Sequence, residues 1–279
     1  MVSQEQRRRQ LAREKFLRQQ QRRTTARRRA RVRNTVVASV LGVVVVGSVV
    51  SYATGVFKND DKSANASAEA SPSASATSKA PDPCEKAAKG KVKSLSYKKE
   101  PAMTIDKSAK YTMELQTTCG DIDIALDAAN APHTVNSFNF LLGKGYLDHT
   151  KCHRLTTAGI YVLQCGDPEG TGMGGPGYTI PDENLDAKSL KGDVYPAGTV
   201  AMANQYNAQT KEGRDSGGSQ FFLVYQDSPL PSDYTPFGTV SESGMKVLKK
   251  IADAGESTGQ GDGTPNATVV IDKATVTKS

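Results

Sequence analysis

The sequence predicts a mainly β fold, an antiparallel β-barrel accompanied by two α-helices, and two observations lead to this class. From residue 111 to residue 276, short segments recur in which apolar and polar residues alternate, as expected of strands with one buried face. In the same region two segments show the spacing of an amphipathic helix. Many short strands with few helices favour an antiparallel barrel over a layered α/β fold.

The first expected strands form a hairpin. Apolar residues occupy every second position in 111–115 and again in 122–126, and the turn Cys119-Gly120-Asp121 separates the two runs. A helix is expected to begin at Pro132 and to end near Gly143, because the apolar residues between them share one helical face.

The later elements follow the same two patterns. In order, they are two short strands around residues 154 and 164, a glycine-rich loop, strands at 199–203 and 220–225, a helix with Met245, Leu248 and Ile251 on one face, and a strand at 267–276. The folded domain is therefore expected to span residues 110–279.

The basic character of the chain is confined to its N-terminal tail. Residues 1–33 hold 13 Arg or Lys against 2 Glu, a net charge of +11, while the whole chain carries +7, so the remaining residues sum to −4. Nucleic-acid binding by the folded domain would need a basic patch there, and we expect no nucleic-acid partner. For the tail (1–34), binding to nucleic acid or to anionic lipid is an alternative, but a role in setting membrane topology is favoured.

A membrane span is predicted at residues 35–57. This segment carries no charge and, as a helix, would rise about 34 Å, enough to cross a hydrocarbon core of roughly 30 Å. The basic tail precedes it, so the N-terminus is expected in the cytoplasm and the folded domain outside. A single-pass anchor is favoured, although Ser51-Tyr52-Ala53 fits a signal-peptide cleavage site and leaves cleavage after Ala53 open.

Residues 58–109 are expected to form a linker and a transition into the domain. The stretch from 64 to 80 consists of Ala, Ser, Asn, Thr, Glu, Lys and Pro, without a large apolar residue. Such a composition cannot bury a core, so this part should be disordered.

Five short motifs occur in a fixed order along the domain: Cys152-His153-Arg154, Gln164-Cys165-Gly166-Asp167, Met202-Ala203-Asn204, Gly218-Ser219-Gln220-Phe221-Phe222 and Pro236-Phe237-Gly238. They resemble the FHR, QGGD, MAN, GSQFF and FGxV motifs of the cyclophilins, over roughly residues 110–276. The resemblance implies a closed eight-stranded antiparallel barrel capped by two helices. It also implies peptidyl-prolyl cis-trans isomerase activity, without a cofactor or a metal ion, on proline-containing segments of unfolded or exported proteins.

The resemblance also implies which residues line the proline groove. Arg154, Gln164 and Phe222 fall on catalytic positions. The substrate-binding positions are Tyr161, Val162, Met202, Ala203, Asn204, Gln220, Leu230 and Tyr234. Because the segment 155–163 is two residues longer than is usual in the family, Ile160 is an alternative to Tyr161.

Three departures from the family pattern concern the groove. Tyr234 stands where most cyclophilins have His, and the chain lacks the Trp that helps to bind cyclosporin, so sensitivity to that drug should be weakened. The loop from Gln205 to Gly217 is longer than usual by about seven residues and is expected to adjust which peptides enter. These departures leave open a second function, a non-catalytic module that binds proline-containing peptides of an envelope partner.

The four cysteines of the chain predict disulfides if the domain is exported. Three complete pairings are open, and a bridge between Cys152 and Cys165 is favoured because their strands should be neighbours. In these positions the cysteines replace an aromatic residue and a glycine of the family motifs. A Cys152–Cys165 bridge would brace the strands that carry Arg154 and Gln164.

Other chemistries find little support in the sequence. The run Gly170–Gly175 formally matches a dinucleotide fingerprint, but Pro168 and Pro176 flank it where a strand and a helix would be required. His153 and Cys152 are adjacent, and neighbours on a strand point to opposite faces, so they do not form a nucleophile–base pair. A hydrolase and a metal site are therefore not expected.

Overall fold

The computed structural model describes residues 81–190 and 192–279, which form ten strands and two helices. The strands are β1 (Tyr111–Thr117), β2 (Gly120–Leu126), β3 (Thr150–Lys151), β4 (Arg154–Thr156), β5 (Val162–Cys165), β6 (Thr199–Met202), β7 (Phe221–Val224), β8 (Pro236–Val240), β9 (Asp262–Gly263) and β10 (Val270–Lys278). The helices are α2 (Pro132–Gly143) and α3 (Glu242–Asp253).

All ten strands belong to one antiparallel sheet, in the order β3-β10-β1-β2-β8-β6-β7-β5-β4-β9. Among the described strands, β3 pairs only with β10 and β9 only with β4, so hydrogen bonds do not join the two ends of the sheet. The mainly β class with two helices is confirmed, whereas the closed eight-stranded barrel is replaced by a ten-stranded sheet with two free ends. Strands β3 and β9 have two residues each, too few to show an alternating pattern in the sequence.

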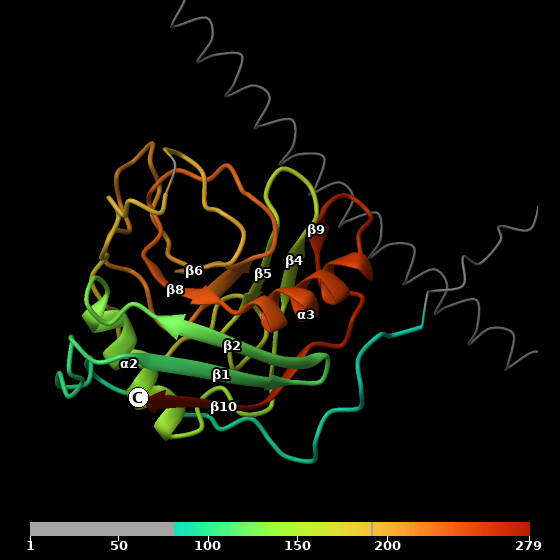
Figure 1. The fold of residues 1–279 in the computed structure, drawn as a ribbon, viewed down its shortest axis with the longest axis horizontal. Coiled ribbons are helices and arrows are strands. Elements are labelled where there is room, and N and C mark those ends of the chain that lie inside the picture. The colour runs from blue at the N-terminus through green and yellow to red at the C-terminus, as the bar shows by residue number, and fades with distance from the viewer. Residues whose placement is uncertain (1–80, 191) are drawn as a thin grey trace, which may run out of the picture. The chain divides into compact units, whose positions relative to one another are not determined.

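The hairpin β1–β2 follows the predicted alternation. Met113 pairs with Ile124 and Leu115 with Ile122, and all four side chains are buried. Figure 1 shows β1 between β2 and β10, with α3 across the hairpin. Cross-strand pairs of buried apolar residues fix the register of such a sheet, because a slip by one residue would turn them to the other face.

The two helices close the main core. Helix α2 begins with Pro132 at its first turn, where a missing N–H costs nothing, and its Phe138 stacks on Phe237 with ring centroids 4.9 Å apart. Helix α3 begins after Ser241, whose hydroxyl accepts a hydrogen bond from the backbone N–H of Gly244. Each helix thus presents its apolar face to the same core.

Residues 81–110, which we call the N-terminal strap, run in extended form along this domain (cyan to green in Figure 1). The backbone N–H of Tyr97 donates to the carbonyl of Pro176 at 2.8 Å, and the Tyr97 ring packs edge-on against Phe140 at 5.0 Å. The N–H of Thr104 donates to Oδ1 of Asn136 at 2.9 Å. The described part of the predicted linker and transition therefore packs against the domain.

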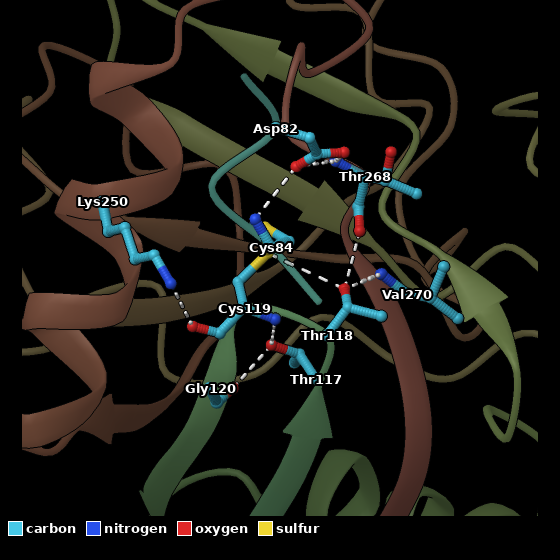
Figure 2. The surroundings of a disulfide bond; sticks show 9 residues. All are labelled: Asp82, Cys84, Thr117, Thr118, Cys119, Gly120, Lys250, Thr268 and Val270. Carbon is cyan, nitrogen blue, oxygen red and sulfur yellow. Dashed lines mark hydrogen bonds between the residues drawn. A yellow bond between two sulfur atoms is a disulfide. The ribbon is translucent and has the colours of Figure 1, made fainter. Parts of the chain in front are cut away.

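A disulfide between Cys84 and Cys119 fastens the start of the strap to the turn of the β1–β2 hairpin (Figure 2). Beside it, the carboxylate of Asp82 accepts hydrogen bonds from the backbone N–H groups of Cys84 and Thr268. The hydroxyl of Thr118 donates to the carbonyl of Thr268 at 2.6 Å. Covalent and polar links thus join the strap, the hairpin and the approach to β10 at one point.

No helix within residues 81–190 and 192–279 has the length and apolar character needed to cross a membrane. The predicted tail, the predicted span at 35–57 and the first part of the predicted linker lie outside the described residues.

Candidate active site

Arg154 lies on β4 opposite Gln164 of β5, and its guanidinium is held from two sides. Its Nε and Nη2 atoms each donate to a different carboxylate oxygen of Asp262, both at 2.8 Å, and Nη1 donates to Oε1 of Gln164 at 3.2 Å. A guanidinium has five N–H donors, so two have no partner among the described residues. The guanidinium of Arg154 is therefore oriented by its partners and still has N–H donors for a substrate.

A chain of side-chain amides extends this network. Gln164 donates through Nε2 to Oε1 of Gln220 at 3.0 Å, and Gln220 donates through Nε2 to the carbonyl of Gly174 at 2.9 Å. The amide orientation of each glutamine follows from its neighbour, because an oxygen must face a donor. The structure thus joins Arg154, Gln164 and Gln220, all three of which the sequence analysis selected.

The ion pair shifts both of its members. The hydrogen bond from Arg154 to Asp262, aided by their Coulomb attraction, holds the pKa of the Asp262 carboxyl below its usual value. The same bond raises the pKa of Arg154 against the opposing effect of burial. Both side chains stay charged at neutral pH, and their partial exposure, 38% for Arg154 and 56% for Asp262, also favours the charged forms.

An apolar cluster separate from the main core lies beside this network. Phe222 and Val162 are buried in it, and Leu230, Tyr234 and Ala203 pack against it. The rings of Phe222 and Tyr234 meet edge-to-face with centroids 5.4 Å apart. Five of the predicted groove residues therefore share one apolar surface.

Tyr195 supports this cluster and was not predicted. Its side chain is fully buried, its hydroxyl donates to the carbonyl of Tyr234 at 2.6 Å, and the backbone N–H of Tyr234 donates back to that hydroxyl at 3.1 Å. Tyr195 lies in a loop outside every motif, flanked by Val194 and Pro196, and no pattern in the sequence marks it as part of the groove. It fixes Tyr234, which replaces the histidine expected from the family.

Two predicted groove residues lie elsewhere. Met202 is buried in the main core, on the other side of the sheet from Ala201 and Phe222. Tyr161 packs against Tyr225 at 5.9 Å and joins the main core, whereas Ile160 packs on the cluster of Phe222. Alternation along a strand explains both placements, and Ile160 takes the place that the sequence analysis offered as an alternative.

Asn204 connects the groove to the next loop. Its Nδ2 donates to the carbonyl of Asp233 at 2.8 Å, and its Oδ1 accepts from the backbone N–H of Tyr206 at 3.2 Å. Within the described chain no hydrogen bond uses the backbone N–H or carbonyl of Asn204. Those two groups are available to an extended peptide.

A cavity of about 430 Å³ adjoins the amide chain. Its wall is formed by Gln164, residues 172–179, 203–205 and 218–220, and Ser216. The Cβ that a larger residue would place at Gly166 would lie 2.1 Å from the carbonyl oxygen of Ser219, so glycine is required where the chain enters this wall. Residues 172–175 of the glycine-rich run line this cavity, and no helix directly follows the run.

Asp167 holds the glycine-rich loop in place. Its carboxylate accepts backbone hydrogen bonds from Glu169, Thr171 and Gly172 at 2.6–2.9 Å. Burial by itself would raise the pKa of Asp167, but these backbone donors, with that of Gly174, bring it below its usual value. Asp167 is consequently a structural anion and not an acid–base group.

The second disulfide lies directly beneath the site and joins Cys152 to Cys165. Both cysteines are buried, and they lie at one end of the β4–β5 pair, next to the paired residues Arg154 and Gln164. The bridge ties the strand entering Arg154 to the strand leaving Gln164. Among residues 81–190 and 192–279 no group of His, Cys, Asp or Glu is arranged to hold a metal ion.

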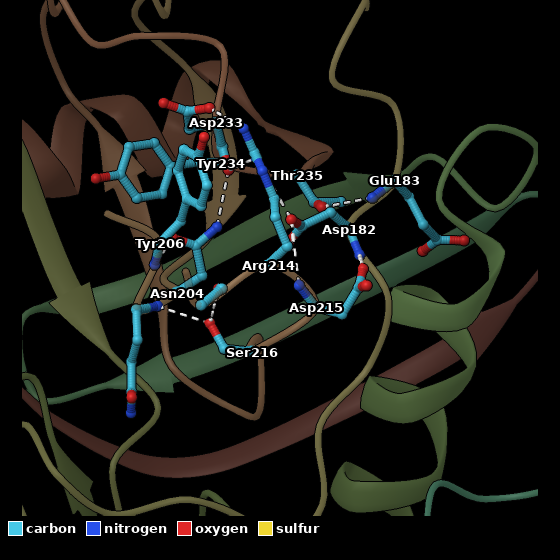
Figure 3. Close-up of polar contacts among 12 residues, drawn as sticks. Asp182, Glu183, Asn204, Tyr206, Arg214, Asp215, Ser216, Asp233, Tyr234 and Thr235 are labelled. Carbon is cyan, nitrogen blue, oxygen red and sulfur yellow. Dashed lines mark hydrogen bonds and ion pairs between the residues drawn. The ribbon is translucent and has the colours of Figure 1, made fainter. Parts of the chain in front are cut away.

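The long loop 205–217 is fastened beside the groove by Arg214 (Figure 3). Arg214 forms ion pairs with Asp182, at 3.4 Å, and with Asp233, and its guanidinium lies over the ring of Tyr206, 3.4 Å from the centroid. The N–H of Asp182 in turn donates to Oδ1 of Asp215 at 2.8 Å. These contacts fix the conformation of the loop 205–217 beside the groove.

The model of the family "Cyclophilin type peptidyl-prolyl cis-trans isomerase/CLD" matches residues 112–276. The chain belongs to the cyclophilin family. The family assignment agrees with the Arg154–Gln164–Gln220 network and the apolar cluster around Phe222.

Two similar proteins, one of them with two solved structures, give the extent of the likeness. A "Probable peptidyl-prolyl cis-trans isomerase B" of Mycobacterium leprae is 45% identical over 172 residues, which are 59% of this chain and 56% of that protein. The chain thus spans about half the length of this relative. A cyclophilin type peptidyl-prolyl cis-trans isomerase of Cryptosporidium parvum is 26% identical in two crystal structures, one of them determined in the presence of the dipeptide Ala-Pro. These two structures align with TM-scores of 0.51 and 0.50, over 61% and 60% of this chain and 99% of theirs.

Proposed function

We propose that this chain is a peptidyl-prolyl cis-trans isomerase that acts on X-Pro bonds without a covalent intermediate. The observation that carries the proposal is Arg154, a guanidinium fixed by Asp262 and Gln164 with two N–H donors left over, beside the apolar cluster of Phe222. A charge held this way next to an apolar surface suits a reaction that develops a lone pair and transfers no group.

The chemistry follows from amide resonance. Rotation about the peptide bond passes a barrier of about 18–20 kcal/mol because resonance is lost in the twisted state. In that state the proline nitrogen becomes pyramidal and carries a localised lone pair. A donor from Arg154 aimed at this nitrogen stabilises the twisted state more than either planar state, which is the differential binding that catalysis requires.

The other groove residues bind the substrate. Phe222, Val162 and Leu230 offer an apolar surface for the proline ring. The free backbone groups of Asn204 suit the extended peptide on one side of the ring. Gln164 is expected to hold Arg154 and to contact the carbonyl before the proline.

The cellular setting that we propose rests mainly on the sequence. The basic tail, the apolar segment 35–57 and the polar stretch that follows favour a single-pass anchor with the isomerase domain outside the cytoplasm. The substrates would then be unfolded or exported proteins. Two disulfides agree with an oxidising compartment.

The test is isomerisation of a short peptide with an Ala-Pro bond by the full chain in mild detergent, measured by exchange NMR. We expect catalysis by the wild type and a loss of about 10²–10³-fold in kcat/KM for Arg154→Ala, the range found when one transition-state donor is removed. A folded wild type that binds the peptide without catalysis would overturn the proposal and leave a peptide-binding module. Activity unchanged in Arg154→Ala would overturn the role of Arg154.

A further inference from the structure

Asp262 stands outside every motif that marks the groove, yet it makes the shortest contacts of Arg154. It lies on β9, where it pairs with Thr156 of β4. Thr156 and Arg154 are two residues apart on one strand, so Asp262 is a diagonal neighbour of Arg154 on the same face. The backbone pairing therefore directs this carboxylate at the guanidinium.

The contact between Asp262 and Arg154 fixes the plane of the guanidinium. Both oxygens of Asp262 are engaged, one by Nε and one by Nη2 of Arg154, each at 2.8 Å. A bidentate carboxylate holds the fork of an arginine in one orientation, which a single hydrogen bond does not. With that edge occupied and Nη1 bound to Gln164, the two remaining N–H donors have fixed directions.

The loop that presents Asp262 is itself built from hydrogen bonds. Glu256 is buried, and its carboxylate accepts from the backbone N–H of Gly261 at 2.8 Å and of Thr258. Gly261 has φ of +89°, and a Cβ there would lie 2.4 Å from Cβ of Ala158. The hydroxyl of Thr258 donates to the carbonyl of Asp262 at 3.1 Å. Asp262 is thus held before any substrate arrives.

Stability gives little reason for this pair. The Asp262 side chain is 56% exposed and that of Arg154 38%, so solvent screens the attraction and limits what the pair contributes to folding. The carboxylate also offsets part of the positive charge that Arg154 offers the groove. Its benefit must therefore lie in direction, since a fixed donor acts on a twisted amide without reorganising.

We infer that Asp262 is the positioning residue of the proposed isomerase reaction, acting through Arg154 by holding its guanidinium in the one orientation that directs the free N–H donors to the proline nitrogen. This inference rests on the proposed function. Asp262 is the first residue of the two-residue strand β9 and lies 108 positions along the chain from Arg154.

The experiment compares Asp262→Asn, which keeps the shape but loses the charge and one acceptor, with Asp262→Glu, which keeps the carboxylate. Asp106→Asn is the matched control, because Asp106 is 52% exposed and pairs with Lys278 at 3.4 Å away from the groove. Isomerisation and thermal unfolding are measured on the full chain. We expect Asp262→Asn to lower kcat by about 10–100-fold, as loss of an orienting partner does, with KM and the unfolding temperature close to those of the control.

Two further measurements separate positioning from packing. Asp262→Glu should recover part of the lost kcat, and Asp262→Asn should cost nothing more when Arg154 is already alanine, because the two residues act as a unit. If Asp262→Asn behaves like Asp106→Asn, or if it lowers activity equally with and without Arg154, the inference is wrong. Those results leave the proposed function intact, which fails separately if the wild type is inactive.

Discussion

Two arginines at the groove use the same chemistry for different ends. Arg154 and Arg214 are 38% and 37% exposed, and each is paired with carboxylates, so neither exposure nor charge pairing distinguishes them. Arg154 has one edge on Asp262 and keeps two donors free beside the apolar cluster. Arg214 is covered on its face by Tyr206 and bound at its edges by two loops. Arg214 also has three of its five N–H donors paired among the described residues, as Arg154 does, so the number of unpaired donors does not distinguish them. What differs is the cover, because the ring of Tyr206 lies on the face of Arg214, whereas Arg154 lies beside the apolar cluster.

The comparison also shows how the groove is assembled. The network of Arg154 lies on paired strands braced by the buried disulfide Cys152–Cys165, whereas the clamp of Arg214 joins loops (Figure 3). Strands with fixed register hold donors more accurately than loops do. We therefore expect changes at Arg154 to appear in kcat and changes at Arg214 to appear in loop order and in the fit of longer peptides.

The largest expected effect comes from replacing each arginine by lysine. Arg154→Lys keeps the positive charge but loses the planar fork, and we expect kcat/KM to fall by about 10²-fold, close to the loss for alanine. Arg214→Lys should change kcat for a short Ala-Pro peptide by less than about twofold, because it leaves the network of Arg154 intact. Exchange NMR on both variants measures the difference. Equal losses of kcat/KM in the two variants would show that Arg154 has no greater part in catalysis than Arg214.

The next effect concerns the two disulfides, of which one fastens the strap and the other braces the strands of Arg154 and Gln164. Cys84–Cys119 closes a separation of 35 residues and fastens the strap (Figure 2), so we expect the double change to Ser to lower the free energy of unfolding by about 2–4 kcal/mol. Activity at 25 °C should stay near that of the wild type, because Cys84 and Cys119 lie away from the groove residues. Denaturant unfolding and peptide isomerisation, each measured on the same sample, check both statements.

The control for this prediction is the second bridge. Cys152→Ser with Cys165→Ser removes the brace beneath Arg154 and Gln164, and here we expect kcat to fall together with stability. If removing Cys84–Cys119 lowers kcat as much as removing Cys152–Cys165, the strap is coupled to the groove. The hydrogen bond from Tyr97 to Pro176 would be the first contact to test for this coupling, because Pro176 lines the cavity.

The elements with a periodic apolar pattern and the residues within the five motifs could be predicted from the sequence. Alternation predicted the β1–β2 hairpin, helical spacing predicted α2 and α3, and the motifs selected Arg154, Gln164 and Gln220, which the structure links. These features are visible because a strand or helix imposes a period, and because the motif residues lie on neighbouring strands.

Other features depend on contacts that no local pattern reports. Asp262 meets Arg154 through the pairing of β9 with β4, and two-residue strands leave no period to read. Tyr195 reaches Tyr234 from a loop, and the strap contacts the domain at single residues such as Tyr97. Tyr161 and Met202 pack with the main core and not with the cluster of Phe222, because one step along a strand reverses the face.

The smallest expected effect is on acid stability and concerns a carboxylate with no catalytic part. The pKa of Asp167 is lowered in the folded protein, so its ionised form is favoured by folding. The stability that it contributes is present above the unfolded pKa of about 3.9 and is lost as pH falls through the lower folded value. In urea unfolding from pH 7 to pH 3, Asp167→Asn should therefore be less stable than the wild type at pH 7, and the two should converge toward pH 3. A constant difference across that range would mean that Asp167 acts through its shape and not through its charge.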